Sequence, residues 1–155
     1  MTKPTLSPEH QLASFLAKFT PEIAARAEAV LIRLRKHLPS AMELVYDNYN
    51  ALAIGFGPTE KTSHAVFSVA VFPRWVSFFF LQAKPLRDTA KILKGTGKVV
   101  KHIVLKDDSM LDDPAVQDLI QQALRSAVVP FDPSAKRQLI IKSISAKQRP
   151  RRPAT

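Results

Sequence analysis

The feature that most constrains the fold is a pair of apolar runs, residues 63–72 (SHAVFSVAVF) and 75–82 (WVSFFFLQ), separated only by Pro73 and Arg74. Each run has the length of a β-strand, and the dipeptide between them predicts a tight turn. Apolar side chains occupy both odd and even positions in each run, so neither face of this hairpin is polar. We therefore expect two central strands covered on both sides, by helices on one face and by the C-terminal segment or a partner chain on the other.

Helices are predicted on both sides of this hairpin in the sequence. Ser7 and Thr20 each precede a proline and a glutamate, which is the pattern of a helix N-terminus, and apolar residues at helical spacing follow both. A third helix is predicted from Pro114, capped by Asp113 or Asp112. Further short strands are predicted at residues 43–47, 51–56 and 99–106. The sequence thus predicts an α+β fold with two N-terminal helices, an antiparallel sheet of about five strands and a C-terminal helix.

The length of 155 residues favours one domain with a substantial core. We expect residues 1–135 to form this domain and residues 136–155 to be a basic C-terminal extension that is partly disordered. The extension holds seven Lys or Arg and no acid, although residues 139–144 within it have a β-like composition.

Several function classes are excluded or disfavoured by composition. The chain has no cysteine, which excludes disulfides, zinc-thiolate sites and thiol nucleophiles. The four histidines are scattered without metal-binding spacing, and no G-x-S-x-G motif occurs, so we expect a protein that is not an enzyme. No stretch has the roughly 18 consecutive apolar residues of a membrane span, and the first residues lack the apolar core of a secretory signal. We therefore expect a cytoplasmic protein without membrane contacts.

The net charge of +10 is distributed unevenly along the chain. Residues 84–106 hold seven Lys or Arg against one acid, together with two of the four glycines. Glycines allow successive backbone N–H groups to converge on an anion, and nearby lysines add positive charge. The spacing is not that of a P-loop, and it also fits a plain two-glycine turn beside a solvated basic face. The candidate anion-binding residues are Arg87, Lys91, Lys94, Gly95, Thr96, Gly97, Lys98 and Lys101.

The basic C-terminal extension is a second candidate contact for polyanions such as nucleic acid. Its candidate contact residues are Lys147, Arg149, Arg151 and Arg152. The extension carries no aromatic side chain on which a base could stack. A solubilising disordered end has the same composition, so the two interpretations stand side by side.

Three strings of the sequence resemble the bacterial YdhG-like family of unknown function: residues 43–58 (ELVYDNYNALAIGFGP), 77–105 and 141–153. The most specific piece is the stretch KGTGKVVKHI at residues 94–103. The resemblance implies a compact α+β fold with an antiparallel sheet and supplies no catalytic residues. One branch of the family is called a frataxin-like iron chaperone, which would make iron the cargo or cofactor.

An acidic block follows the basic segment directly and contains Asp107, Asp108, Asp112 and Asp113. Carboxylates so close together are candidate ligands for a hard cation such as iron. The block lacks the alternating pattern of a calcium loop, and helix capping accounts for one of its last two members.

Three hypotheses about function follow. The first is a non-enzymatic binding module, monomeric or homodimeric, that contacts an anionic ligand or protein partner through the basic segment, with nucleic acid among the candidates. The second is an iron chaperone that uses the acidic block. The third is a small-molecule pocket on the aromatic sheet face around Trp75, Phe78 and Phe80.

Overall fold

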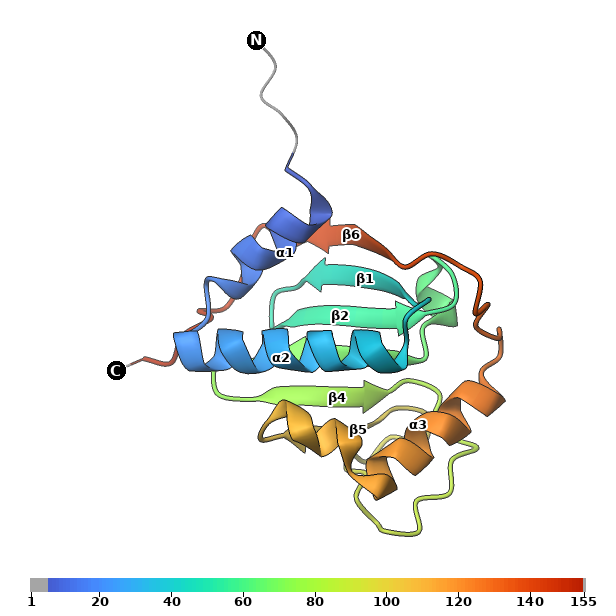
Figure 1. The fold of residues 1–155 in the computed structure, drawn as a ribbon. Coiled ribbons are helices and arrows are strands. Elements are labelled where there is room, and N and C mark those ends of the chain that lie inside the picture. Colours follow the sequence, from blue (N-terminus) through green and yellow to red (C-terminus); the bar gives the residue numbers. More distant parts are fainter. Residues whose placement is uncertain (1–5, 155) are drawn as a thin grey trace.

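The computed structural model describes residues 6–154 and has an α+β architecture in which a mixed sheet carries its helices on one face (Figure 1). The α+β class predicted from the sequence is confirmed. The strands lie in the order β5-β4-β3-β2-β1-β6. The helices are α1 (Pro8–Leu16), α2 (Pro21–His37) and α3 (Pro114–Ser126), with short 3-10 turns η1 (Thr62–His64) and η2 (Asp108–Asp112). The strands are β1 (Met42–Asp47), β2 (Leu52–Gly57), β3 (Phe67–Val71), β4 (Val76–Phe80), β5 (Lys101–Leu105) and β6 (Gln138–Ile144).

The helices begin where their capping residues predict. The Ser7 side chain accepts a hydrogen bond from the His10 N–H, and the Thr20 side chain accepts one from the Ile23 N–H. Asp113 caps α3 in the same way through the Ala115 N–H. Each cap satisfies a backbone donor that the first turn leaves free, and a proline follows each cap because it needs no donor there.

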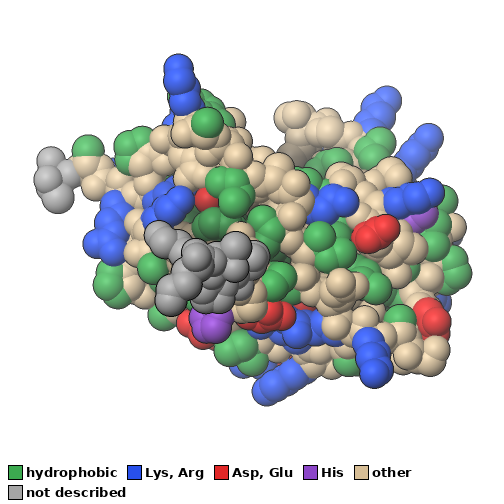
Figure 2. All heavy atoms as spheres, turned by 90° about the horizontal axis from the view of Figure 1, so that it is seen from above, with side chains coloured by type: hydrophobic (Ala, Val, Ile, Leu, Met, Phe, Trp, Pro, Cys, Tyr) green, Lys and Arg blue, Asp and Glu red, His purple; other side chains and the backbone are tan. Residues whose placement is uncertain are grey.

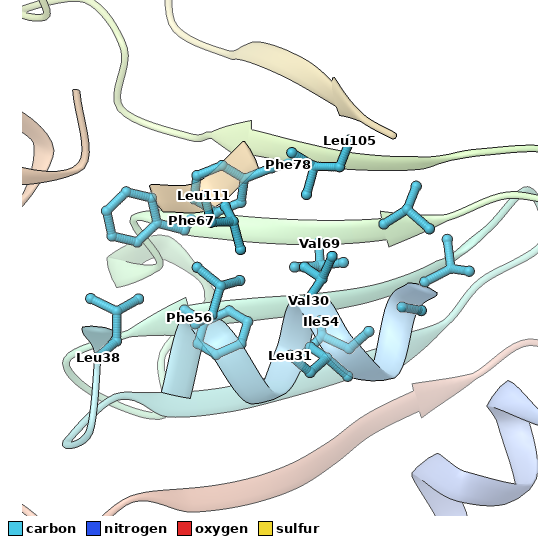
Figure 3. Close-up of a cluster of buried hydrophobic side chains, with 14 of the residues drawn as sticks. Val30, Leu31, Leu38, Ile54, Phe56, Phe67, Val69, Phe78, Leu105 and Leu111 are labelled. Atoms are coloured by element: carbon cyan, nitrogen blue, oxygen red, sulfur yellow. The ribbon is translucent and has the colours of Figure 1, made fainter. Parts of the chain in front are cut away.

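The predicted hairpin is β3–β4, and it forms the centre of the core. Phe67 and Phe78 stack with their ring centroids 5.5 Å apart, and both lie on the face that α2 covers. Val30 and Leu31 of α2 project onto this face, with Ile54 beneath them (Figure 3). Burial of these large side chains supplies most of the stabilisation of the domain.

The opposite face of the sheet is covered only in part, and by a segment that the sequence did not indicate. Residues 62–66 fold back over β2, where a Cβ atom on Gly57 would lie 2.9 Å from the Cα of Ala65. The hydroxyl of Tyr46 bonds to Thr62, which fixes the same segment. Farther along this face, Trp75 and Val104 are about two-fifths exposed. Residues 62–66 therefore cover the part of this face near β2, where the sequence predicts the C-terminal segment or a partner chain as the cover.

The C-terminal residues differ most from expectation. We predicted a partly disordered extension after residue 135, but β6 lies there and pairs parallel with β1. This strand makes the sheet mixed and six-stranded, whereas the sequence predicts an antiparallel sheet of about five strands. The following residues run across the end of the sheet: the Ser145 N–H donates to the Asp47 carbonyl and the Arg149 N–H to the Tyr49 carbonyl. The Arg152 side chain donates to the carbonyls of Ala17 and Lys18, just after α1. We call residues 145–153 the C-terminal strap.

Two carboxylates of β1 face the helices and are fully buried, Glu43 and Asp47. Glu43 accepts from Arg35 of α2, at 2.8–3.1 Å, and from Arg137 just before β6. Asp47 pairs with Arg151 of the strap at 2.9 Å and with Lys18 at 3.4 Å. Buried charges require such partners, so these two acids tie the C-terminal segment to the first strand and the helices.

Among residues 6–154, no helix combines the length and the apolarity that crossing a bilayer would require.

Candidate anion-binding loop

The basic segment predicted from the sequence forms a long connection at one edge of the sheet. Residues 81–100 join β4 to β5 and contain no helix or strand. Loops longer than about 12–15 residues are uncommon in compact domains unless they are functional or disordered. We call this connection the lysine loop, and we extend the name to Lys101 at the start of β5.

The lysine loop is held at several points. The side-chain amide of Gln122 on α3 accepts from the Arg87 N–H at 2.8 Å and donates to the Arg87 carbonyl at 3.1 Å. The carboxylate of Asp88 accepts from the N–H groups of the two apolar residues 92 and 93, which pack against the core. Lys94 and His102 exchange backbone hydrogen bonds of 2.8 and 2.9 Å. The loop therefore presents its cations from a fixed backbone.

The candidate residues of the loop lie on the surface. The side chains of Lys94, Thr96 and Lys98 are exposed, and Gly95 has the positive φ of 112° that favours glycine. The ammonium of Lys101 donates to the Gly95 carbonyl at 2.8 Å and supports the turn. In the described chain, the backbone N–H groups of residues 95–100 donate to no protein acceptor. This tip offers both N–H donors and positive charge to an anion.

The other two candidates, Arg87 and Lys91, lie closer to α3 than the tip does. Arg87 shares a shallow cleft with Asp118, and Lys91 has a positive φ of 54° in the turn that Asp88 closes. Within residues 6–154, neither these two nor the three lysines of the tip forms an ion pair. The structure thus divides the predicted set into a tip (residues 94–101) and a flank (residues 87–91).

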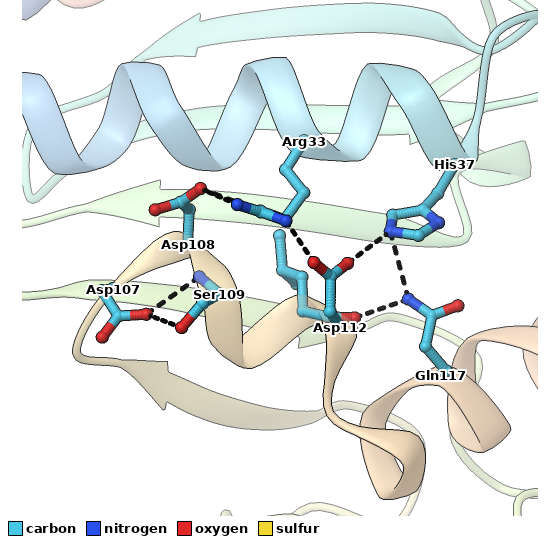
Figure 4. Close-up of polar contacts among 8 residues, drawn as sticks. Arg33, His37, Asp107, Asp108, Ser109, Asp112 and Gln117 are labelled. Atoms are coloured by element: carbon cyan, nitrogen blue, oxygen red, sulfur yellow. Dashed lines mark hydrogen bonds and ion pairs between the residues drawn. The ribbon is translucent and has the colours of Figure 1, made fainter.

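Two carboxylates of the acidic block, Asp108 and Asp112, pair with side chains of α2 and not with the lysine loop (Figure 4). Arg33 pairs with Asp108 at 2.7 Å and also with Asp112. His37 bonds to the other oxygen of Asp112 at 3.1 Å and to the amide of Gln117. The hydrogen bond with His37, aided by the charge of Arg33, holds the pKa of Asp112 below its usual value. These contacts hold η2 and α3 against α2, and we call the contacts of Asp112 with Arg33 and His37 the Asp112 clasp.

The remaining acids of the block have local structural roles. Asp107 accepts from the hydroxyl and the N–H of Ser109, which lowers its pKa, and Asp113 caps α3. In the part of the chain that the structure describes, no three His, Asp or Glu side chains are grouped to hold a metal ion. The carboxylates considered for iron are therefore each engaged elsewhere.

We expect the contribution of the Asp112 clasp to stability to depend on pH. The folded pKa lies below the unfolded value of 3.8, so the clasp stabilises the fold above that pH and loses its effect as the pH falls through the folded pKa. Urea unfolding of the native chain and of Asp112→Asn should differ at pH 6 and converge below pH 3.8. A gap between the two proteins that does not shrink as the pH falls below 3.8 would contradict this account.

The pocket expected around Trp75, Phe78 and Phe80 does not form. Phe78 and Phe80 are buried on the helix-covered face, where they pack edge-to-face with centroids 5.0 Å apart. Trp75 lies just before β4 at an odd-numbered position, whereas Phe78 and Phe80 are at even-numbered positions. Side chains alternate between the two faces of a strand, so Trp75 lies at the open face of the sheet, where it is exposed. The three side chains therefore share no surface.

A different cavity of about 350 Å³ lies between α1, α2 and β6. Its walls are apolar and include Leu12, Leu16 and Leu139, while Arg35 and Arg137 line it where they hold Glu43. Two exposed glutamates at residues 9 and 28 complete its lining, so its charges favour neither an anion nor a cation.

The tail residues proposed as contacts have different environments. Arg151 is buried against Asp47 and Arg152 is engaged with the carbonyls of Ala17 and Lys18, whereas Lys147 and Arg149 are exposed. Figure 2 shows Lys and Arg side chains at several separate places on the face seen there, not in one patch. Positive charge on this face is therefore distributed over several places.

Comparisons of this chain with protein-family models, with curated proteins and with solved structures found no match.

Proposed function

We propose that the protein is a non-enzymatic binding module that contacts an anionic ligand or protein partner through the lysine loop, with nucleic acid among the candidate partners. The observation that carries this proposal is the absence of any acid partner, within residues 6–154, for Lys94, Lys98 or Lys101. Asp108 and Asp112 of the acidic block that follows in the sequence pair with Arg33 and His37 instead.

The geometry of the loop supports this function in two ways. Its backbone is anchored by Gln122 and Asp88, so little ordering cost is added when a partner binds. Its tip combines the exposed ammonium groups of Lys94 and Lys98 with free N–H donors at residues 95–100, a combination suited to phosphate or carboxylate oxygens. We further propose a cytoplasmic location, which suits a chain without cysteine, and membership of the YdhG-like family.

The experiment is a salt titration of nucleic-acid binding, followed by fluorescence anisotropy. We expect the affinity of the native chain to fall linearly with the logarithm of salt concentration. The double variant Lys94→Gln/Lys98→Gln should bind more weakly, and its slope should be smaller by about 1.4–1.8, the value for two lost phosphate contacts.

A matched control separates the loop from net charge alone. Lys36→Gln/Lys61→Gln removes the same charge from two exposed lysines on α2 and before η1. It should leave the slope nearly unchanged. The proposal fails if both double variants behave alike, or if no binding to nucleic acid or to an acidic polypeptide is detected at low salt.

A further inference from the structure

The end of β4 opposite the lysine loop carries a second concave surface. A hollow of about 650 Å³ lies where the β3–β4 turn meets the C-terminal strap. We call it the strap hollow; it is lined by Asn50, Phe72, Pro73, Arg74, Trp75, Arg149 and Pro150. Its volume falls within the range of about 300–1,000 Å³ that is usual for small-molecule sites.

Aromatic rings stand at the surface of the strap hollow. Trp75 stacks on Phe72 with the centroids 4.6 Å apart and the planes 17° from parallel. Trp75 nevertheless remains 40% exposed, and Tyr49 beside the hollow is 48% exposed. Large aromatic side chains are costly to leave in water, and here Phe72 holds the indole in a fixed orientation.

The charges of the strap hollow have one sign. Arg74 and Arg149 line it, no acid does, and among the described residues neither guanidinium pairs with a carboxylate. Two acids of the surrounding elements have other partners: Asp47 pairs with Lys18 and Arg151, and Glu22 pairs with Arg26. The guanidinium of Arg149 lies 5.6 Å from the centre of the Tyr49 ring.

The hollow is preformed by the backbone. The Arg149 N–H donates to the Tyr49 carbonyl at 2.9 Å, and the Phe72 N–H donates to the Trp75 carbonyl at the same distance. These bonds set the strap against the two turns. A ligand would therefore meet a strap backbone and a Trp75 ring that are already in position.

We propose that the strap hollow binds a nucleotide unit: an aromatic base that stacks on Trp75 and a phosphate that the two arginines hold. Exposed rings beside unpaired arginines match this chemistry, since bases stack on aromatic faces and guanidiniums donate paired hydrogen bonds to phosphate. A ligand that consists only of an anionic group would make no stacking contact with the aromatic rings. The ligand is either a free nucleotide or an unpaired base of a single strand, and this site is independent of the lysine loop.

Trp75 is the only tryptophan, so its fluorescence reports directly on this site. We expect AMP to quench it in a saturable way. Ribose 5-phosphate, which lacks the base, should bind about 5- to 150-fold more weakly, the factor that corresponds to one stacked base. Arg74→Gln and Arg149→Gln should weaken AMP while leaving the weaker binding of adenosine unchanged. Lys94→Gln/Lys98→Gln should leave AMP binding intact, which separates this test from that of the lysine loop.

Further arms distinguish the two sources of the ligand. If a short oligothymidylate binds more tightly than TMP and a duplex does not quench Trp75, the ligand is a single strand. If the oligothymidylate and TMP bind with equal affinity, the ligand is a free nucleotide. The proposal is overturned if no nucleotide or oligonucleotide quenches Trp75. It is also overturned if ribose 5-phosphate binds as well as AMP, or if neither arginine variant affects AMP while circular dichroism shows both to be folded.

Discussion

Shortening the chain to residues 1–135 should remove its cooperative unfolding transition. The deletion takes away β6 and leaves the edge of β1 unpaired. It also takes Arg137 from Glu43 and Arg151 from Asp47, both of which are fully buried. Removing one partner of a buried pair costs about 3–5 kcal/mol. Glu43 keeps Arg35 and Asp47 keeps Lys18, but these losses together with that of β6 approach the whole net stability of a domain, about 5–15 kcal/mol.

Thermal and urea unfolding followed by circular dichroism would measure this effect. A chain ending at Pro153 is the matched control, because it keeps β6 and the whole strap and should unfold as the native chain does. A cooperative transition of the 1–135 chain near the native midpoint would show that residues 136–155 are dispensable and would contradict the role given to β6.

The second large effect is expected at Arg151. We expect Arg151→Met to destabilise the fold by about 3–5 kcal/mol, because Asp47 would keep only Lys18, at 3.4 Å, as its charged partner. The guanidinium also donates to the Asn48 carbonyl and lies over the Phe19 ring, so its loss opens contacts on three sides. Urea unfolding of the variant gives the change in free energy directly.

A double-mutant cycle tests whether the pairing itself carries the effect. Combining Arg151→Met with Asp47→Asn should cost less than the sum of the single changes, with a coupling of up to about 3 kcal/mol. Arg149→Met is a suitable control two residues away, since Arg149 is exposed and should cost less than about 1 kcal/mol. An Arg151 variant as stable as this control would refute a structural role for the strap.

The parts of the fold that follow from local sequence were predictable. The caps at Ser7, Thr20 and Asp113 act on the next turn of chain, and the β3–β4 hairpin closes across two residues, so composition and spacing suffice. The parallel pairing of β6 with β1 was not predictable in this way. It joins residues 96 or 97 positions apart, and Leu139 and its neighbours look like a short apolar stretch in a basic tail.

In the candidate site, too, contacts between residues far apart in the sequence were not predictable. The cations of the lysine loop were identified from composition, but the pairing of the acidic block with Arg33 and His37, which lie on a helix far earlier in the sequence, was not predictable. Phe72 and Trp75 were assigned to apolar strands covered on both sides, and Trp75 was also grouped in a pocket with Phe78 and Phe80, because these residues adjoin one another in the sequence. One signal was present: Trp75 directly follows the turn residue Arg74, so the end of the hairpin was a place to expect surface aromatics.

The parallel β1–β6 pair has a consequence for the protein as it is synthesised. The strand β1 is synthesised 96 residues before its neighbour β6. Until residues 137 and 151 have emerged from the ribosome, Glu43 has only Arg35 and Asp47 has only Lys18 as a charged partner, so both buried carboxylates are incompletely paired. Completion of this part of the fold is thereby coupled to synthesis of the strap, and until then the edge of β1 stays open to pairing with other strands.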